Sequence, residues 1–201
     1  MNKILCYGDS NTFGFNPKDG SRFDEDTRWT ALLQKNLKNN YEIIEEGMCD
    51  RTGFVDNPKG FLFTSQRHFP KFLSKFNKFD TIILAIGTND LQTQYNIGFN
   101  AIQRGLADLI KTAQEKSDKI IIIPPVILQE NILNGYFKIQ FNETSVVKSK
   151  KIGTVYRKLS NAFNCCYFDI NKIVLPSEID GLHYDAAAHK IIADKLTQYI
   201  T

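Results

Sequence analysis

The sequence predicts an α/β fold, a three-layer α/β/α sandwich built on a parallel sheet. Short apolar runs alternate with longer amphipathic segments along the chain, which is typical of parallel strands joined by helices. Two of the runs are almost purely Ile and Leu, as expected for strands buried on both faces. The 201 residues suit a single domain, residues 1–201, whose core needs no disulfide or metal.

Five apolar runs are the expected strands, and the third and fourth of them are the Ile/Leu-rich ones. Each is short and is followed by a turn or a polar loop. These two properties favour a strand over a segment of buried helix. In chain order they are Lys3–Tyr7, Tyr41–Glu45, Thr81–Ile86, Lys119–Ile123 and Cys165–Phe168.

Three segments have the apolar periodicity of amphipathic helices: Thr30–Leu37, Phe99–Lys116 and Ala186–Ile200. Two long loops, Asp50–Ser65 and Pro124 to about Ser145, follow expected strands and should overhang the edge of the sheet that carries the site. Their aromatic side chains are expected to line an acyl or alcohol pocket, or else to cover the protein's own surface or an oligomer contact. They are Phe54, Phe61, Phe63, Tyr136, Phe137 and Phe141.

Composition and charge indicate an ordinary globular protein, with 42% hydrophobic and 23% charged residues. The formal net charge of +3, spread over scattered lysines, gives no support for binding nucleic acid or an anionic membrane. The chain has no long apolar run and no signal-peptide pattern, so we expect a cytoplasmic protein. The cysteines have no zinc-like spacing and are expected to be reduced thiols: Cys6, Cys49, Cys165 and Cys166.

A serine follows the first expected strand directly, in the turn Gly8-Asp9-Ser10-Asn11. Open α/β sheets place their chemistry at this end of the strands. Gly8 permits a tight turn, and a helix beginning here would aim backbone N–H groups at an anionic oxygen. Gly-Asp-Ser is also a common turn, and Thr12 breaks the Gly-x-Ser-x-Gly pattern of the nucleophile elbow. Ser10 is therefore a candidate nucleophile, but not of the usual α/β-hydrolase type.

Two residues are candidates for stabilising an oxyanion, which a serine nucleophile requires. Asn89, after the third strand, is able to direct a side-chain amide to the same edge as Ser10. An Asx-capped turn is the alternative for Asn89. Gly47, after the second strand, is placed to offer a backbone N–H, and a plain turn glycine is its alternative.

Asp180 and His183 stand three residues apart near the end of the sequence. This spacing lets a carboxylate orient an imidazole, which fixes its tautomer and leaves the other ring nitrogen to act as the base. His68, among polar and basic neighbours, is expected at the surface, and His189 is expected to pack or to face solvent. Cys49 is a further candidate nucleophile without an assigned base.

Four residues match, in order, the four blocks that name the SGNH or GDSL-type hydrolases: Ser10, Gly47, Asn89 and His183. Because these blocks extend from the first strand to the last helix, nearly the whole chain resembles that family. The resemblance implies a flavodoxin-like sheet with strand order 2-1-3-4-5 and hydrolysis of esters or thioesters with no cofactor or metal. It also implies an oxyanion hole made by the N–H groups of Ser10 and Gly47 and the Asn89 amide. Asn11 stands where the family's eponymous leucine would be.

Further segments resemble the bacterial arylesterase and acetyl-transferring esterase branch, whose members prefer short acyl groups and often form oligomers: Gly8–Gly14, Arg22-Phe23, Thr27–Trp29, Glu45–Gly47 and Arg51-Thr52. We therefore expect a serine esterase for small short-acyl or aryl esters, with acyl transfer to alcohols and a homo-oligomer left open. Alternatives are a carbohydrate O-deacetylase, a thioesterase or lysophospholipase, and a non-catalytic flavodoxin-like module for an anion or flavin. The lack of a Gly-rich phosphate loop argues against the last.

Overall fold

A five-stranded parallel sheet forms the centre of the computed structural model, which describes residues 2–200. The strand order is β2-β1-β3-β4-β5, which confirms the predicted α/β class and order. Each strand lies at one of the five predicted runs, and only the end residues differ. The strands are β1 (Asn2–Gly8), β2 (Tyr41–Gly47), β3 (Thr81–Ala85), β4 (Ile120–Ile123) and β5 (Cys166–Tyr167).

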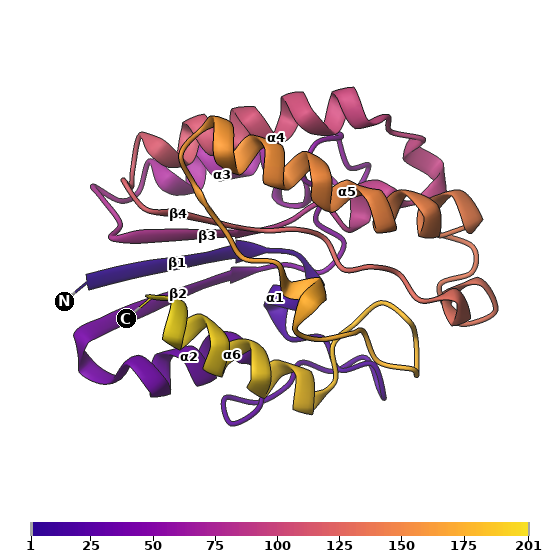
Figure 1. Cartoon of the computed structure of the whole chain (residues 1–201), viewed down its shortest axis with the longest axis horizontal. Coiled ribbons are helices and arrows are strands. Elements are labelled where there is room, and N and C mark those ends of the chain that lie inside the picture. The colour runs from indigo at the N-terminus through magenta and orange to yellow at the C-terminus, as the bar shows by residue number, and fades with distance from the viewer. Residues whose placement is uncertain (1, 201) are drawn as a thin grey trace.

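Helices cover both faces of this sheet and make the three layers (Figure 1). Helices α2 and α6 pack together on one face, while α3, α4 and α5 form the layer on the other. The short α1 directly follows β1. The helices are α1 (Ser10–Phe13), α2 (Trp29–Leu37), α3 (Ser65–Leu73), α4 (Phe99–Gln114), α5 (Glu143–Ala162) and α6 (Ala186–Ile200).

Two of these helices, α3 and α5, are absent from the sequence-based prediction. The buried face of α5 includes small polar residues, among them Ser145, Ser149 and Ser160, so its apolar periodicity is interrupted. Helix α3 contains Pro70 and a polar first turn. Pro is unfavourable inside a helix, and this segment therefore resembles a loop in sequence.

The central strands β3 and β4 are buried on both faces, as their Ile/Leu composition predicts. Because all strands are parallel, their carboxyl ends meet at one edge of the sheet, and the loops that follow them gather there (Figure 1). Asn2, at the start of β1, and Ile200, at the end of α6, lie toward the opposite edge. Within residues 2–200, no helix has the length and apolar character needed to cross a membrane.

Candidate active site

Ser10 is the first residue of α1, directly beyond the carboxyl end of β1. Asp9 caps this short helix through its Oδ1, which accepts the Asn11 N–H at 3.1 Å. Gly8 is required for the turn, because a Cβ there would lie 2.1 Å from Thr12 Oγ1 and 2.4 Å from the Ala85 carbonyl oxygen. The tight strand-to-helix connection therefore fixes the Ser10 hydroxyl at the edge of the sheet.

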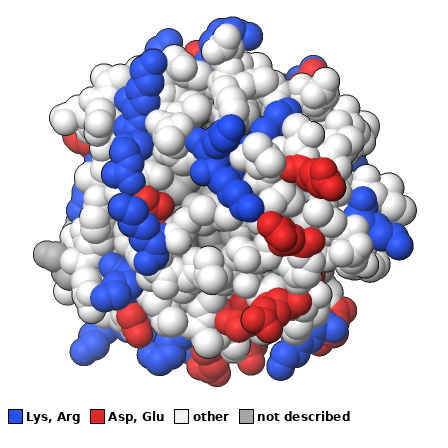
Figure 2. All heavy atoms as spheres, turned by 45° about the vertical axis from the view of Figure 1, so that its right-hand side comes forward, with Lys and Arg blue, Asp and Glu red and all other residues white. Residues whose placement is uncertain are grey.

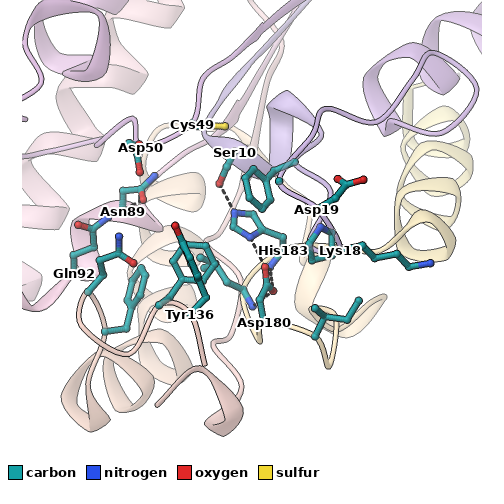
Figure 3. Close-up of a pocket in the computed structure, with 18 of the residues that line it drawn as sticks. Ser10, Lys18, Asp19, Cys49, Asp50, Asn89, Gln92, Tyr136, Asp180 and His183 are labelled. Carbon is teal, nitrogen blue, oxygen red and sulfur yellow. Dashed lines mark hydrogen bonds and ion pairs between the residues drawn. The ribbon is translucent and has the colours of Figure 1, made fainter. Parts of the chain in front are cut away.

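His183 and Asp180 lie beside Ser10, although they are far from it in sequence (Figure 3). His183 Nε2 is 2.9 Å from Ser10 Oγ, and His183 Nδ1 is 2.7 Å from Asp180 Oδ2. The second carboxylate oxygen, Asp180 Oδ1, accepts the backbone N–H groups of Leu182 and His183, each at 2.9 Å. The structure thus brings the three predicted residues into one continuous hydrogen-bonded line.

The surroundings of Asp180 keep it ionised. Burial raises its pKa, but the hydrogen bond and charge of His183, together with the two backbone N–H groups, outweigh burial and hold the pKa below its ordinary value. An ionised carboxylate accepts the Nδ1 proton of His183. The Nε2 lone pair is then directed at the Ser10 hydroxyl, which is the arrangement that a general base requires.

Two aromatic rings flank the imidazole of His183. The centroid of the Phe15 ring lies 4.1 Å from that of His183, and the centroid of the Phe137 ring lies 5.4 Å from it. Phe15 comes from the loop after α1, whereas Phe137 belongs to the loop between β4 and α5. Both rings limit the positions that the imidazole is able to adopt. Phe15 escaped sequence analysis, because nothing in the sequence shows that its loop returns to the carboxyl edge.

A cavity of about 640 Å³ opens beside Ser10. Tyr136, Phe137 and Phe141 line it, as predicted, but Phe54, Phe61 and Phe63 do not. Phe54 instead packs near Gly105 and Tyr156. The residues around the cavity are Ser10, Phe15, Pro17, Lys18, Asp19, Gly20, Cys49, Asp50, Lys59, Asn89, Gln92, Tyr136, Phe137, Gln140, Phe141, Ile179, Asp180, Leu182 and His183.

Asn89 also lines this cavity, in the turn directly after β3, where the sequence places it. Its Nδ2 donates to the Arg51 carbonyl at 3.0 Å, and its Oδ1 accepts from Gln92 Nε2 at 3.0 Å. Figure 3 shows Asn89 and Gln92 on one side of Ser10, with Asp180 on the other. The side-chain amide is therefore on the correct side of the cavity for an oxyanion donor.

Gly47 does not reach the cavity, contrary to its predicted role. It is the last residue of β2, paired with Gly8, and it packs against the backbone of α1. A Cβ at Gly47 would lie 2.2 Å from Phe13 N, so glycine is needed there for close packing. Asp50, three residues later, lines the cavity with a left-handed backbone of φ 61°. Among residues 2–200, the Asp50 N–H has no hydrogen-bond acceptor.

Arg51 is a buried residue to which the sequence assigns no role beyond its place in the segment Arg51-Thr52. Its Nη1 donates to the carbonyl oxygens of Gly8, at 3.1 Å, and Glu46, at 2.6 Å, while its Nη2 contacts Glu46 Oε1 at 2.7 Å. Its own carbonyl accepts from Asn89. Arg51 therefore ties the carboxyl ends of β1 and β2 to the asparagine on the cavity wall. An arginine in a loop ordinarily indicates exposed surface, so nothing in the sequence predicts these buried contacts.

The other two histidines make contacts away from Ser10. His68 is buried, not at the surface as predicted, with Nδ1 3.3 Å from Tyr7 Oη and Nε2 3.9 Å from Glu46 Oε1. His189 is also buried, and its Nδ1 accepts the Trp29 N–H at 3.2 Å. His183 is thus the one histidine beside Ser10 in the described part of the chain.

Cys49 lines the cavity but is poorly suited to act as its nucleophile. Burial raises the pKa of its thiol to about 11, with smaller contributions from Asp50 and Asp9. A protonated thiol is a weak nucleophile. Among residues 2–200, no group of three or more His, Cys, Asp or Glu side chains is arranged to hold a metal ion.

Comparison with known proteins gives a consistent match. The model of the GDSL-like lipase/acylhydrolase family matches residues 6–191. The inhibitor-bound aryl esterase of M. smegmatis is 26% identical and superimposes with a TM-score of 0.90, over 100% of this chain and 98% of that one. A carbohydrate acetylesterase family member from Sinorhizobium meliloti is 27% identical, with a TM-score of 0.87 over 100% and 97% of the two chains. No curated protein sequence matches the chain.

Proposed function

Because the chain belongs to the GDSL-like lipase/acylhydrolase family of ester-hydrolysing enzymes, we propose that it is a serine esterase for small carboxylic esters with short acyl or aryl groups. The observation that carries this proposal is the hydrogen-bonded line from Ser10 through His183 to Asp180 at the wall of the cavity. Its geometry supplies a nucleophile, a base and a carboxylate that orients the base.

In the proposed reaction, His183 Nε2 takes the proton of Ser10 Oγ as that oxygen attacks the ester carbonyl. Asp180 stabilises the imidazolium that forms. The imidazolium then protonates the leaving alcohol, and the acyl group remains on Ser10. Water, or another alcohol, attacks the acyl-serine with His183 again as the base, and Ser10 is regenerated.

The oxyanion of the tetrahedral intermediate requires donors fixed before the reaction begins. The Asn89 amide and the N–H of Ser10, at the first turn of α1, are two of them. Asp50 replaces Gly47 as the third, because it lines the cavity and its N–H is free of other acceptors within residues 2–200. Its left-handed φ of 61° is a conformation that aspartate tolerates better than most residues.

The walls of the cavity support a small substrate of moderate polarity. Phe15, Tyr136 and Phe137 provide aromatic surface for an aryl or short acyl group. The face turned toward the reader in Figure 2 carries both signs of charge, with much uncharged surface between them. The charged side chains that line the cavity are also of both signs, Lys18 and Asp50 among them. No field of one sign therefore favours a highly charged substrate, and a neutral ester suits the cavity.

Acetylated carbohydrates are the second candidate substrates. Three side-chain amides, those of Asn89, Gln92 and Gln140, line the cavity beside the aromatic rings. Amides are able to hydrogen-bond the hydroxyl groups of a sugar. The S. meliloti neighbour is described as a carbohydrate acetylesterase family member, which supports this second candidate.

The test compares Ser10→Ala with wild type in the hydrolysis of p-nitrophenyl acetate and in labelling by a fluorophosphonate. We expect the variant to lose at least about a thousandfold in kcat and to resist labelling. Ser74→Ala, which changes an exposed serine at the end of α3, is the matched control and should behave as wild type. Hydrolysis by Ser10→Ala at the wild-type rate would refute the proposal.

A substrate series then separates the two candidates and the longer-chain alternatives. We expect kcat/KM to be highest for acetyl and aryl acetate esters and to fall once the acyl chain exceeds the cavity. An acetylated monosaccharide preferred over aryl acetates would favour the carbohydrate candidate. Preference for long-chain thioesters or lysophospholipids would contradict the proposed substrate class.

A further inference from the structure

The side chain of Asn89 is held by two hydrogen bonds that leave one donor free. Its Nδ2 carries two hydrogens, of which one is directed to the Arg51 carbonyl at 3.0 Å. Its Oδ1 accepts from Gln92 Nε2 at 3.0 Å. The side chains of Asn89 and Gln92 are well shielded, since the residues are 6% and 7% exposed. The second Nδ2 hydrogen is the one left for the cavity.

Gln92 is itself oriented by a neighbour. Gln94 Nε2 donates to Gln92 Oε1 at 2.8 Å. Because the oxygen of Gln92 is occupied as an acceptor, its Nε2 is the group that faces Asn89. The three amides thus form a chain of donors and acceptors that runs in one direction, from Gln94 through Gln92 and Asn89 to the Arg51 carbonyl.

This direction distinguishes the two ways in which the Asn89 amide is able to lie. If the amide were reversed, Nδ2 would face the Nε2 of Gln92 and Oδ1 would face the Arg51 carbonyl. Two donors would then meet at one end and two acceptors at the other, in a buried place where an unsatisfied polar group is costly. Without the Gln92 donor, only the bond to Arg51 would oppose the reversed orientation.

We propose that Gln92 is a positioning residue, which fixes the Asn89 amide so that Nδ2 is presented to the oxyanion. This inference rests on the proposed esterase function and goes further, because it adds a residue that acts on the scissile ester only through Asn89. Asn89 lies one turn of 3₁₀ helix before Gln92, so the donor and its support belong to the same short segment after β3.

The primary variant is Gln92→Met, which keeps the size of the side chain and removes its donor. A fixed oxyanion donor is worth about a hundredfold to a thousandfold in kcat, and a donor that is misoriented part of the time should cost roughly tenfold. KM should change little, since the lost interaction is made mainly in the transition state. Gln94→Met, at an exposed position, should give a smaller loss in kcat by the same route.

A double-mutant cycle tests whether Gln92 acts through Asn89. Wild type, Gln92→Met, Asn89→Ala and the double variant are compared by kcat for p-nitrophenyl acetate. We expect Gln92→Met to reduce kcat in the wild-type background and to have no further effect once Asn89 is alanine. An equal loss in both backgrounds, or no loss in wild type, would overturn the proposal.

Gln140→Met is the matched control, because Gln140 lines the same cavity without a bond to Asn89. Gln140→Met should change kcat by the same factor in the wild-type protein and in Asn89→Ala. If Gln92→Met does not fold, the cycle is run with Gln94→Met and is judged by the same criterion. Failure of the esterase proposal is distinguished beforehand, because Ser10→Ala would then hydrolyse the ester as fast as wild type.

Discussion

Asn11 holds the peptide groups on both sides of His183. Its Nδ2 donates to the carbonyl of Leu182 at 3.2 Å, and its Oδ1 accepts the N–H of Tyr184 at 3.1 Å. Asn11 directly follows Ser10 in α1, so the expected nucleophile and the expected base are joined by a buried side chain as well as by their own contact. The distance between the two reacting groups therefore depends on a residue that touches neither the ester nor the imidazole.

Asn11→Leu should weaken this connection while keeping a similar side-chain volume. We expect kcat to fall roughly tenfold, because small displacements of reacting groups are costly. The free energy of unfolding should fall by about 1–3 kcal/mol, since two backbone groups lose their buried partner. Steady-state kinetics and urea unfolding measure these effects. Asn161→Leu, at an exposed position on α5, is the control, and an unchanged kcat in Asn11→Leu would contradict the expectation.

Asp180→Asn should be as damaging to kcat as Asp180→Ala. The two backbone N–H groups at Oδ1 require an oxygen there, so the amide nitrogen of the new side chain would face His183 Nδ1. Nδ1 would then have to accept, and the proton would be placed on Nε2, where it blocks transfer from Ser10. We expect a loss of about a thousandfold or more in kcat. An Asp180→Asn enzyme within tenfold of wild type would show that the tautomer is not controlled in this way.

His189 should make the protein sensitive to mild acid. Burial, with a smaller contribution from the nearby His183, lowers its pKa from 6.5 to about 4, while Asp185 opposes the shift. The neutral ring accepts the Trp29 N–H at the start of α2. The unfolded chain takes up a proton below about pH 6.5 and the folded one only near pH 4. The free energy of unfolding should therefore fall as the pH is lowered through this interval. At about 1.4 kcal/mol per pH unit, the loss approaches roughly 3 kcal/mol.

The measurement is urea unfolding at several pH values for wild type and His189→Gln. Glutamine keeps an acceptor for the Trp29 N–H but does not titrate. The wild-type protein should lose more stability than the variant between pH 6.5 and 4. If the free energy of unfolding fell by the same amount in both proteins between pH 6.5 and 4, His189 would not be the cause of the loss of stability in acid.

Arg51→Met should destabilise the protein by about 3 kcal/mol, because the Glu46 carboxylate and three backbone carbonyls would lose a partner that is fully buried. Arg67→Met is the contrasting variant. Arg67 pairs with Asp56, and both side chains are well exposed, at 62% and 66%, so the expected change is below about 1 kcal/mol. Equal effects in urea unfolding would contradict the role assigned to Arg51.

The sheet was predictable because the amino-acid composition of its central strands reflects their burial on both faces. Ile82 to Leu84 and Ile120 to Ile123 are apolar without interruption, and only a strand with two covered faces suits that pattern at so short a length. Ser10, Asn89 and His183 were predictable for a related reason. Each stands beyond a recognisable strand or before the last helix, and a parallel sheet brings such positions to one edge.

The remaining features depend on contacts that no local pattern encodes. Gly47 and Asp50 are three residues apart, and the sequence does not show that one serves close packing while the other adopts the left-handed conformation at the cavity. Helix α5 buries serines, which conceals its periodicity. Phe15 and Gln92 are ordinary residues in sequence, and their importance arises from the folding of their loops around His183 and Asn89.

The position of Asn2 and Ile200 toward the edge of the sheet opposite the cavity has a practical consequence. A fluorescent reporter, an affinity handle or a solid support attached from either position would leave the cavity mouth pointing into free solution. Immobilised enzyme should therefore keep its access to ester and water, whichever of the two attachment points is chosen.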